Sequence, residues 1–555
     1  MVQKTLADGE SGTSVAHKLA KGQRDIGIAE FFARNRHLLG FDNKKKALMT
    51  TVKEAVDNSL DACEEAGVLP EVSVEIIDMG SSRFRVIVED NGPGIVKAQI
   101  PKIFGKLLYG SKFHRLKMSR GQQGIGISAS VMYGQLTTGR PAKITSKVQK
   151  DKPAHYYELK IDTQKNTPTI VTDREMDWPK ETGTRIELDL EANYSGGMQS
   201  VDQYLKETAI TNPHVTIIYT NPKAQQLIFP RASEEMPPQT TEIKPHPYGV
   251  ELGVLMDMLT TTEARTLQSF LTHDFSRVGA GTAKQICEHA LIPPETKPKK
   301  ISQEGAEKLI KAIRETRIMA PSTDCIAPIG KDMIEKGLKK EINAEYYVST
   351  TRPTSVYRGN PFIIEAGIAY GGEQDSEGLI TVMRFANRVP LLYQQGACAA
   401  SKSISGTNWR SYGLSQSNGS LPQGPVTIMV HIASVWVPFT SESKEAIAHY
   451  PEIIKEIKLA LQECGRSLGS YLKKKKKVKD ELKKRGYIEK HIPHVAEALK
   501  KILDLGDADS EKINHNLKDL LEKKRGQVEE VGFDKTKNVE YDEEFAKIGR
   551  EEDEE

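Results

Sequence analysis

The stretch SRGQQGIGISASVMYGQ, residues 119–135, places four glycines among small, polar and apolar residues and contains no lysine. A P-loop would read GxxxxGK[ST], and no such string occurs in the chain. Glycines leave backbone N–H groups uncovered, and the N-terminus of a following helix adds positive potential. The stretch therefore predicts a phosphate-binding turn that needs no lysine of its own. The alternative is a loop that merely packs tightly.

A polar helix face precedes this turn. In EAVDNSLDA, residues 54–62, Glu54, Asn58 and Asp61 stand at positions i, i+4 and i+7 of one helix, which we expect between a cap at Asp42 and a stop at Gly67. A carboxylate can orient or deprotonate a water, and a neutral amide can bind Mg²⁺ beside a triphosphate. The alternative is a solvated polar face.

A second motif, EDNGPGI at residues 89–95, follows an alternating strand pattern. Its Asp90 can accept a hydrogen bond from the exocyclic amine of adenine, and the glycines at 92 and 94 allow a sharp turn beneath it. An Asn-Gly hairpin turn is the alternative. The segment 104–120, FGKLLYGSKFHRLKMSR, is rich in glycine and basic residues and suits a mobile lid.

Composition describes a globular chain of several domains. The 555 residues are 38% hydrophobic and 28% charged, with a net charge of +3, so any basic surface must be local. There is no apolar run of 18 residues and no signal-peptide pattern, which favours a cytosolic location without a membrane span. The five cysteines lack a CxxC pair, so we expect buried free thiols rather than zinc or disulfides.

The order of elements predicts the architecture. Helices and strands intermix to about residue 228, as in an α/β sandwich, and a proline-rich passage at 230–249 reads as a linker. Residues 248–320 look helical, and strands return from about 324 to 440. A long helix follows, whose apolar stripe could be an arm or could pack inside its own domain; the stripe comprises Ile454, Ile457, Leu461, Cys464, Leu468 and Tyr471.

Together, the helix with ExxxN, the strand with DxGxG, the lid and the GxxGxG turn closely resemble the Bergerat-fold (GHKL) ATPases, which include gyrase B, the heat-shock chaperone, histidine kinases and MutL. The later ETGTRIEL, with Gly183 and Thr184, resembles the element that frames adenine in that superfamily. Longer strings, such as NRHLLGFDNKKKALMTTVKEAVDNSLDACEEAGVLP and MRFANRVPLLYQ, resemble the B subunits of archaeal type IIB DNA topoisomerases, the topoisomerase VI family, over residues 20–475.

The resemblance implies an α/β multidomain fold class. We expect a strap at 1–40, a Bergerat-fold α/β sandwich ATPase domain at 41–244 and a helix-two-turn-helix domain at 245–323. An α/β transducer domain with a long helix would occupy 324–487, and a charged extension with no counterpart would occupy 488–555.

The resemblance also implies site residues for ATP and Mg²⁺. Glu54 would be the general base and Asn58 the Mg²⁺ ligand, while Asp90 and Thr184 would contact adenine. Lys444, in the transducer, would reach the γ-phosphate, although without the resemblance it reads as a surface lysine. The lid would contribute Ser111 and Lys112, and the phosphates would be wrapped by Gly121, Gln122, Gln123, Gly124, Ile125, Gly126, Ile127 and Ser128.

The implied partners are double-stranded DNA, a second copy of this chain bound when ATP is present, and a separate A subunit that cleaves DNA within an A₂B₂ heterotetramer. The expected location is the cytoplasm of an archaeal cell, at the nucleoid. Candidate DNA contacts are Arg277, Lys284, Lys297, Lys299, Lys300 and Lys473 to Lys477, each of which could equally be a solvated charge.

Three alternatives belong to other classes. A MutL-like ATP-gated repair scaffold would lack the helical domain between ATPase and transducer. A chaperone of the heat-shock type would carry a long acidic linker, and a histidine kinase would need a phospho-acceptor helix upstream of its ATPase.

Overall fold

The computed structural model describes residues 19, 26–111, 115–121, 124–441 and 443–525. The chain divides into two compact units, one that ends at Ser467 and one that begins at Leu468. The five cysteines are free and buried, which confirms that expectation.

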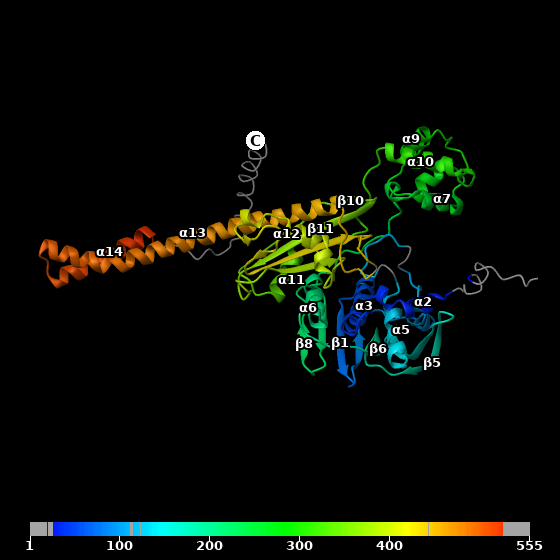
Figure 1. The fold of residues 1–555 in the computed structure, drawn as a ribbon, viewed down its shortest axis with the longest axis horizontal. Coiled ribbons are helices and arrows are strands. Elements are labelled where there is room, and N and C mark those ends of the chain that lie inside the picture. The colour runs from blue at the N-terminus through cyan, green and yellow to red at the C-terminus, as the bar shows by residue number, and fades with distance from the viewer. Residues whose placement is uncertain (1–18, 20–25, 112–114, 122–123, 442, 526–555) are drawn as a thin grey trace, which may run out of the picture. The chain divides into compact units, whose positions relative to one another are not determined.

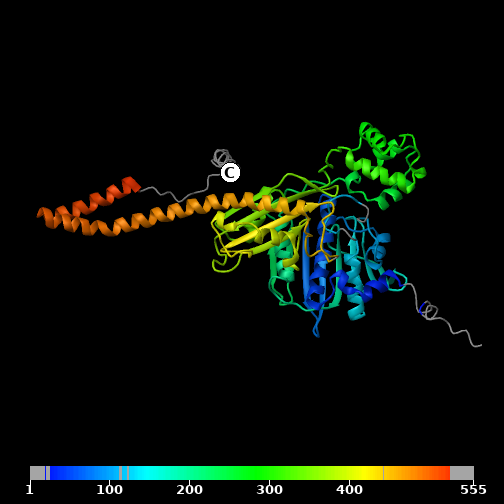
Figure 2. The ribbon, with the colours of Figure 1, turned by 45° about the horizontal axis from the view of Figure 1, so that its top comes forward.

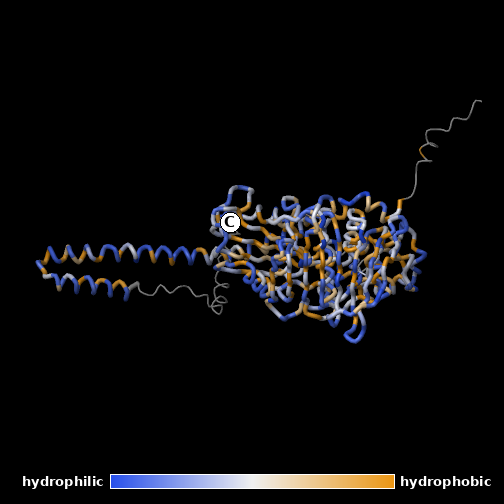
Figure 3. The backbone as a smooth tube through the Cα atoms, turned by 90° about the horizontal axis from the view of Figure 1, so that it is seen from below, coloured by the Kyte–Doolittle hydropathy of each residue, from blue (hydrophilic) through white to orange (hydrophobic). Residues whose placement is uncertain are grey.

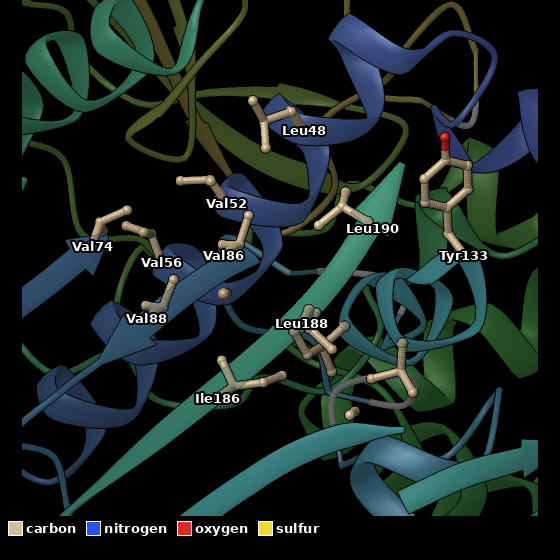
Figure 4. Packing of buried hydrophobic residues seen from close by; sticks show 14 of the residues in the cluster. Leu48, Val52, Val56, Val74, Val86, Val88, Tyr133, Ile186, Leu188 and Leu190 are labelled. Carbon is tan, nitrogen blue, oxygen red and sulfur yellow. The ribbon is translucent and has the colours of Figure 1, made fainter. Parts of the chain in front are cut away.

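Helix α3 (Lys44–Glu65) is the organising helix of the N-terminal domain. Its cap is Asn43, whose side chain accepts a hydrogen bond from the Lys46 amide, so the expected cap at Asp42 was wrong by one residue. Asp42 instead pairs with the Lys46 ammonium at 3.0 Å. The apolar face of α3 packs against the sheet and against α5, as Figure 4 shows for Leu48, Val52, Val56, Val74, Val86, Val88, Tyr133, Ile186, Leu188 and Leu190.

The sheet beneath α3 has eight strands in the order β5-β4-β3-β6-β2-β1-β7-β8. Neighbours are antiparallel except β1 and β7, which are parallel. Buried and half-buried residues alternate along β1 and β6, as expected where helices cover one face. The strands are β1 (Glu71–Asp78), β2 (Arg83–Glu89), β3 (Ala142–Lys147), β4 (Ala154–Asp162), β5 (Thr167–Met176), β6 (Gly183–Glu191), β7 (Thr216–Thr220) and β8 (Gln226–Phe229).

Helices lie together on one side of this sheet (Figures 1 and 2). Besides α3 they are α2 (Ile28–Arg34), α4 (Ile100–Gly105), α5 (Gly126–Thr138) and α6 (Val201–Thr211). This is the α/β sandwich predicted from the sequence, and the predicted fold class is confirmed.

The helical segment that follows builds a small core of its own. It consists of α7 (Leu252–Thr261), α8 (Leu267–Asp274), α9 (Ala280–Ala290) and α10 (Gln303–Glu315). Leu255, Phe270, Ile286 and Leu309 are each fully buried in one apolar cluster. Its position in the sequence between the two sheets and its separate core are consistent with the predicted helical domain. The exact bounds of that domain, 245–323, remain a prediction.

A second sheet has six strands, with β11 (Asn360–Tyr370) and β16 (Val426–Ser434) at its centre. Nearly every residue of these two strands is buried, because helices cover both faces. The other strands are β9 (Tyr346–Thr351), β10 (Ser355–Tyr357), β12 (Thr381–Ala386) and β13 (Val389–Pro390); α11 (Lys331–Glu341), α12 (Ala399–Ser405) and a small ribbon of β14 (Ser415–Gln416) and β15 (Pro422–Gln423) surround them.

Helix α13 (Pro451–Leu503) begins on this sheet. Ile457, Leu461 and Cys464 are fully buried, and the Cys464 thiol donates to the Ala366 carbonyl at 3.6 Å. The apolar stripe starts at Ile453 rather than at Ile454, which is only half-buried. Up to residue 464 the stripe therefore packs inside its own domain.

The second unit contains the rest of α13 and α14 (Asp507–Arg525). Hydrophilic residues predominate along both helices (Figure 3). In its described part the buried apolar side chains are Leu468, Ile492, Ala496 and Leu521, and Arg485 lies 3.9 Å from Glu522. No helix in the described ranges is both long and apolar enough to span a membrane.

Candidate functional site

A cavity of about 620 Å³ opens between α3, the glycine turn and two segments of the second sheet's domain. Those two segments are residues 390–393 and 443–445. Most of the predicted site residues line it: Glu54, Asn58, Asp90, Ser111, Gly121, Gly124, Ile125, Gly126, Ile127, Thr184 and Lys444. The fold thus brings residues that are far apart in the sequence, such as Glu54 and Lys444, to one cavity.

Among the predicted residues that the structure describes, Ser128 does not line the cavity. Ser128 is buried, and its hydroxyl donates to the Ile125 carbonyl at 3.1 Å. This side chain therefore stabilises the turn rather than facing the cavity. Lys112, Gln122 and Gln123 lie outside the described residues.

Asp90 lines the cavity and directly follows the last residue of β2. Its Oδ1 accepts from the Gly92 and Thr184 amides at 2.9 and 3.0 Å, and its Oδ2 accepts from the Ser59 hydroxyl at 2.8 Å. Burial raises the pKa of this carboxyl above its ordinary value, although the three hydrogen bonds oppose the shift. A carboxylate has about four acceptor positions, so one further donor can be accommodated.

The glycine turn leads directly into α5. Gly124 has a left-handed φ of 58°, and Gly126 is the first residue of the helix. The N-cap residue, Ile125, has no side chain that can cap the helix, and there is no acidic residue in the first turn. The first turn of α5 therefore has no carboxylate of its own to neutralise the positive potential of its amides.

Glu54 lies directly against this helix start. A Cβ atom on Gly126 would lie only 1.6 Å from Oε2 of Glu54, so the carboxylate occupies the space that any other residue at 126 would fill. Lys53, which also lines the cavity, donates to Oε1 of Glu54 at 3.1 Å. The carboxylate is thus held between a lysine and the helix N-terminus.

The loop that carries Lys444 is anchored to the N-terminal domain. Lys444 has a φ of 54°, an uncommon conformation for a residue with a side chain. Its neighbour Glu445 forms a 2.5 Å ion pair with Lys46 of α3 and accepts from Gln394 at 2.6 Å. Burial lowers the pKa of Lys46, but Glu445 and Asp42 outweigh it, so the net shift is upward.

Asp61 does not reach the cavity, although it shares a helix face with Glu54. The cavity extends along α3 as far as Ala62, but Asp61 lies with Arg120 at a separate, small pocket. There it binds the buried Arg120 guanidinium at 2.8 Å, together with Glu64 at 2.6 Å and Asn212 at 2.6 Å. Arg120 immediately precedes the glycine turn, so this network fixes the start of the turn.

Sequence reasoning missed Lys46, Lys53 and Arg120. Each of the three is a cation paired with a carboxylate. No motif in the sequence indicates that Lys46 pairs with Glu445, or that Arg120 is buried among Asp61 and Glu64. The i, i+4 spacing of Lys53 and Asp57 was a usable signal, because those side chains are neighbours on a helix.

The side chains that line the cavity suit a Mg²⁺ ion that takes few of its ligands from the protein. Within the described ranges, no group of three or more His, Cys, Asp or Glu could hold a metal, and no protein group hydrogen bonds to the Asn58 side chain. An amide oxygen on a nucleotide cavity suits Mg²⁺, which takes most of its other ligands from phosphates and water.

Comparison with known proteins places the chain. Residues 43–191 match the family described as histidine kinase-, DNA gyrase B- and HSP90-like ATPase, and residues 321–484 match the topoisomerase VI B subunit transducer. The B subunit of type 2 DNA topoisomerase 6 from Methanococcoides burtonii is 51% identical over 88% of this chain and 79% of its own length. This chain belongs to that family. The family member from Methanosarcina mazei is 50% identical over 89% of this chain and 79% of its own length. The family member from Archaeoglobus fulgidus is 48% identical over 87% of this chain and 80% of its own length.

Membership confirms the resemblance seen in the sequence. The chain is an ATP-dependent B subunit of the type II topoisomerase class, with a GHKL ATPase domain followed by a transducer domain. The repair-scaffold alternative is thereby set aside.

Proposed function

We propose that the cavity binds ATP with adenine at Asp90 and Thr184 and the triphosphate along the glycine turn from Gly121 to Ser128. The observation that carries this is the convergence of Glu54, Asp90, the turn and Lys444 on one cavity. Backbone amides at the start of α5 would bind the phosphates. Ser111, and Lys112 beside it, would close over the nucleotide as part of the lid.

Glu54 is the general base of this proposal. Its carboxylate lies against the first residue of α5, where a water in line with the terminal phosphate can be oriented and deprotonated. Asn58, one helical turn further along α3, would hold Mg²⁺ through its amide oxygen. The metal would supply charge neutralisation for the phosphates.

Lys444 would bind the γ-phosphate and so report the nucleotide state to the transducer. A cation from a second domain that contacts only the triphosphate form stabilises one arrangement of the two domains before hydrolysis and releases it afterwards. This makes Lys444 both a catalytic residue and the coupling residue.

Family membership supports a proposal for the partners. Two copies of this chain would dimerise when ATP binds and enclose a DNA segment, and an A subunit in an A₂B₂ assembly would cleave a second duplex for strand passage, which relaxes supercoils and separates linked circles. The basic residues proposed for DNA contact, including Arg277 and Lys473 to Lys477, are all exposed. We place this enzyme in the archaeal cytoplasm, at the nucleoid.

Relaxation of supercoiled plasmid tests the proposal. The chain, a matching A subunit and ATP are combined, and each component is omitted in turn. Activity is expected only when all three are present. Relaxation without ATP, or without the A subunit, would contradict it.

A further inference from the structure

Lys53 is a nearly buried lysine with two carboxylate partners on its own helix. Its side chain is 14% exposed, and its ammonium lies 3.1 Å from Oε1 of Glu54 and 3.1 Å from Oδ2 of Asp57. Burying a charge is unfavourable unless it is paired, so both contacts hold the ammonium in place.

Asp57 is itself fixed from the other side. Its side chain is 4% exposed, and its Oδ1 accepts from the Tyr204 hydroxyl at 2.8 Å. Tyr204 is fully buried on α6. A continuous chain of hydrogen bonds therefore runs from Tyr204 through Asp57 and Lys53 to Glu54.

This chain of hydrogen bonds reaches Glu54 at Oε1. Lys53 binds Oε1, while Oε2 faces the start of α5, where a Cβ atom on Gly126 would overlap it. A carboxylate held at one oxygen presents the other in a fixed direction. General-base catalysis depends on that direction, because misplacement by about 1 Å can reduce a rate on the order of 100-fold.

We propose that Lys53 is a positioning residue for ATP hydrolysis, held by Asp57 and Tyr204, that directs Oε2 of Glu54 toward the attacking water. The proposal rests on the assignment of Glu54 as general base. Lys53 acts through Glu54 and does not bind the nucleotide. Its loss therefore lowers kcat and leaves nucleotide affinity nearly unchanged.

The test compares full-length variants by steady-state ATP hydrolysis, by titration with a fluorescent ATP analogue, and by thermal unfolding. Lys53→Met is expected to lower kcat by about 10- to 100-fold, with analogue affinity within about threefold of wild type. Lys53→Arg, which keeps the charge, is expected to lose less. Lys44→Met on the same helix, whose lysine is exposed and pairs with Glu191, is the matched control and should retain full activity.

Lys53→Met also leaves Asp57 buried without its cation and so destabilises the fold. The double variant Lys53→Met/Asp57→Asn removes that unpaired charge. It is expected to recover thermal stability but not kcat. If kcat recovers together with stability, or if analogue binding weakens in parallel with kcat, Lys53 is structural or binds the nucleotide, and the inference is overturned.

Glu54→Ala, measured in parallel, separates the two proposals. If Glu54→Ala hydrolyses ATP normally, the proposed base is wrong whatever Lys53 does. If Glu54→Ala is inactive while Lys53→Met keeps wild-type kcat, only the positioning role fails.

Discussion

The ammonium of Lys46, in the first turn of α3, lies 2.5 Å from Oε1 of Glu445, the residue that follows Lys444. The side chains are 11% and 8% exposed, and the Lys46 ammonium also lies 5.5 Å from the centre of the Tyr393 ring. One ion pair thus joins the helix that carries Glu54 to the loop that carries Lys444.

Breaking this pair should loosen the loop. Glu445→Ala is expected to lower the free energy of unfolding by about 2 kcal/mol, as for loss of a hydrogen bond between charged groups, and to reduce dimer formation with a non-hydrolysable ATP analogue. Lys46→Met should do the same, and the double variant should lose less than the sum. Glu452→Ala, at an exposed position of α13, is the control. Additive losses would mean that the pair does not couple the two domains.

The same pair should persist at alkaline pH. The pKa of Lys46 is raised above 10.5, so its contribution to stability is fully present below pH 10.5 and is lost only as the pH rises through the higher folded-state value. The coupling energy of Lys46 and Glu445 should therefore be equal at pH 7 and pH 9. Chemical denaturation of wild type, Lys46→Met, Glu445→Ala and the double variant at pH 7 and pH 9 measures this coupling energy. A marked fall in the coupling energy by pH 9 would contradict the raised pKa of Lys46.

Gly126→Ala should inactivate the enzyme by displacing the base. The added methyl group would lie 1.6 Å from Oε2 of Glu54, so the carboxylate must move. We expect kcat to fall on the order of 100-fold, since such a displacement misplaces the catalytic group. Gly253→Ala in α7, where the new methyl group meets nothing within 4 Å, is the control and should keep full ATPase activity. Normal ATP hydrolysis by Gly126→Ala would show that the position of Glu54 is unimportant.

Glu207, buried on α6, should make the protein less stable as the pH rises. Burial raises its pKa to about 7, although Gln203 donates to it at 2.8 Å. The folded value exceeds the ordinary value of 4.5, so ionisation costs stability progressively between about pH 4.5 and pH 7. Glu207→Gln should therefore be more stable than wild type at pH 8, by about 2 kcal/mol, and nearly equal to it at pH 4.5. Thermal unfolding at both values is the measurement, and an equal difference at both would exclude this carboxyl as the cause.

The sequence predicted the elements whose signals are local. The apolar and small face of α3, the alternation in β2 and the glycine turn before α5 depend on neighbours within a few residues, and each element formed where expected. Asp90 and Glu54 could be placed because short motifs mark them. Lys444 needed the family resemblance, because nothing near it distinguishes it from a surface lysine.

Contacts between residues far apart in the sequence could not be predicted in this way. The Lys46–Glu445 pair, the Asp61–Arg120 pair and the bond from Tyr204 to Asp57 join residues distant in sequence, and they exist only once the sheets and helices are packed. Helical periodicity placed Asp61 on the same face as Glu54 but could not show that Arg120 binds its carboxylate outside the cavity.

A structure of the chain with Mg²⁺ and a non-hydrolysable ATP analogue would show where the triphosphate binds and which residues contact it. We expect the triphosphate along Gly121–Ser128, adenine at Asp90, and the Lys444 ammonium within hydrogen-bonding distance of the terminal phosphate. A triphosphate bound away from the turn, or Lys444 directed away from that phosphate, would contradict it.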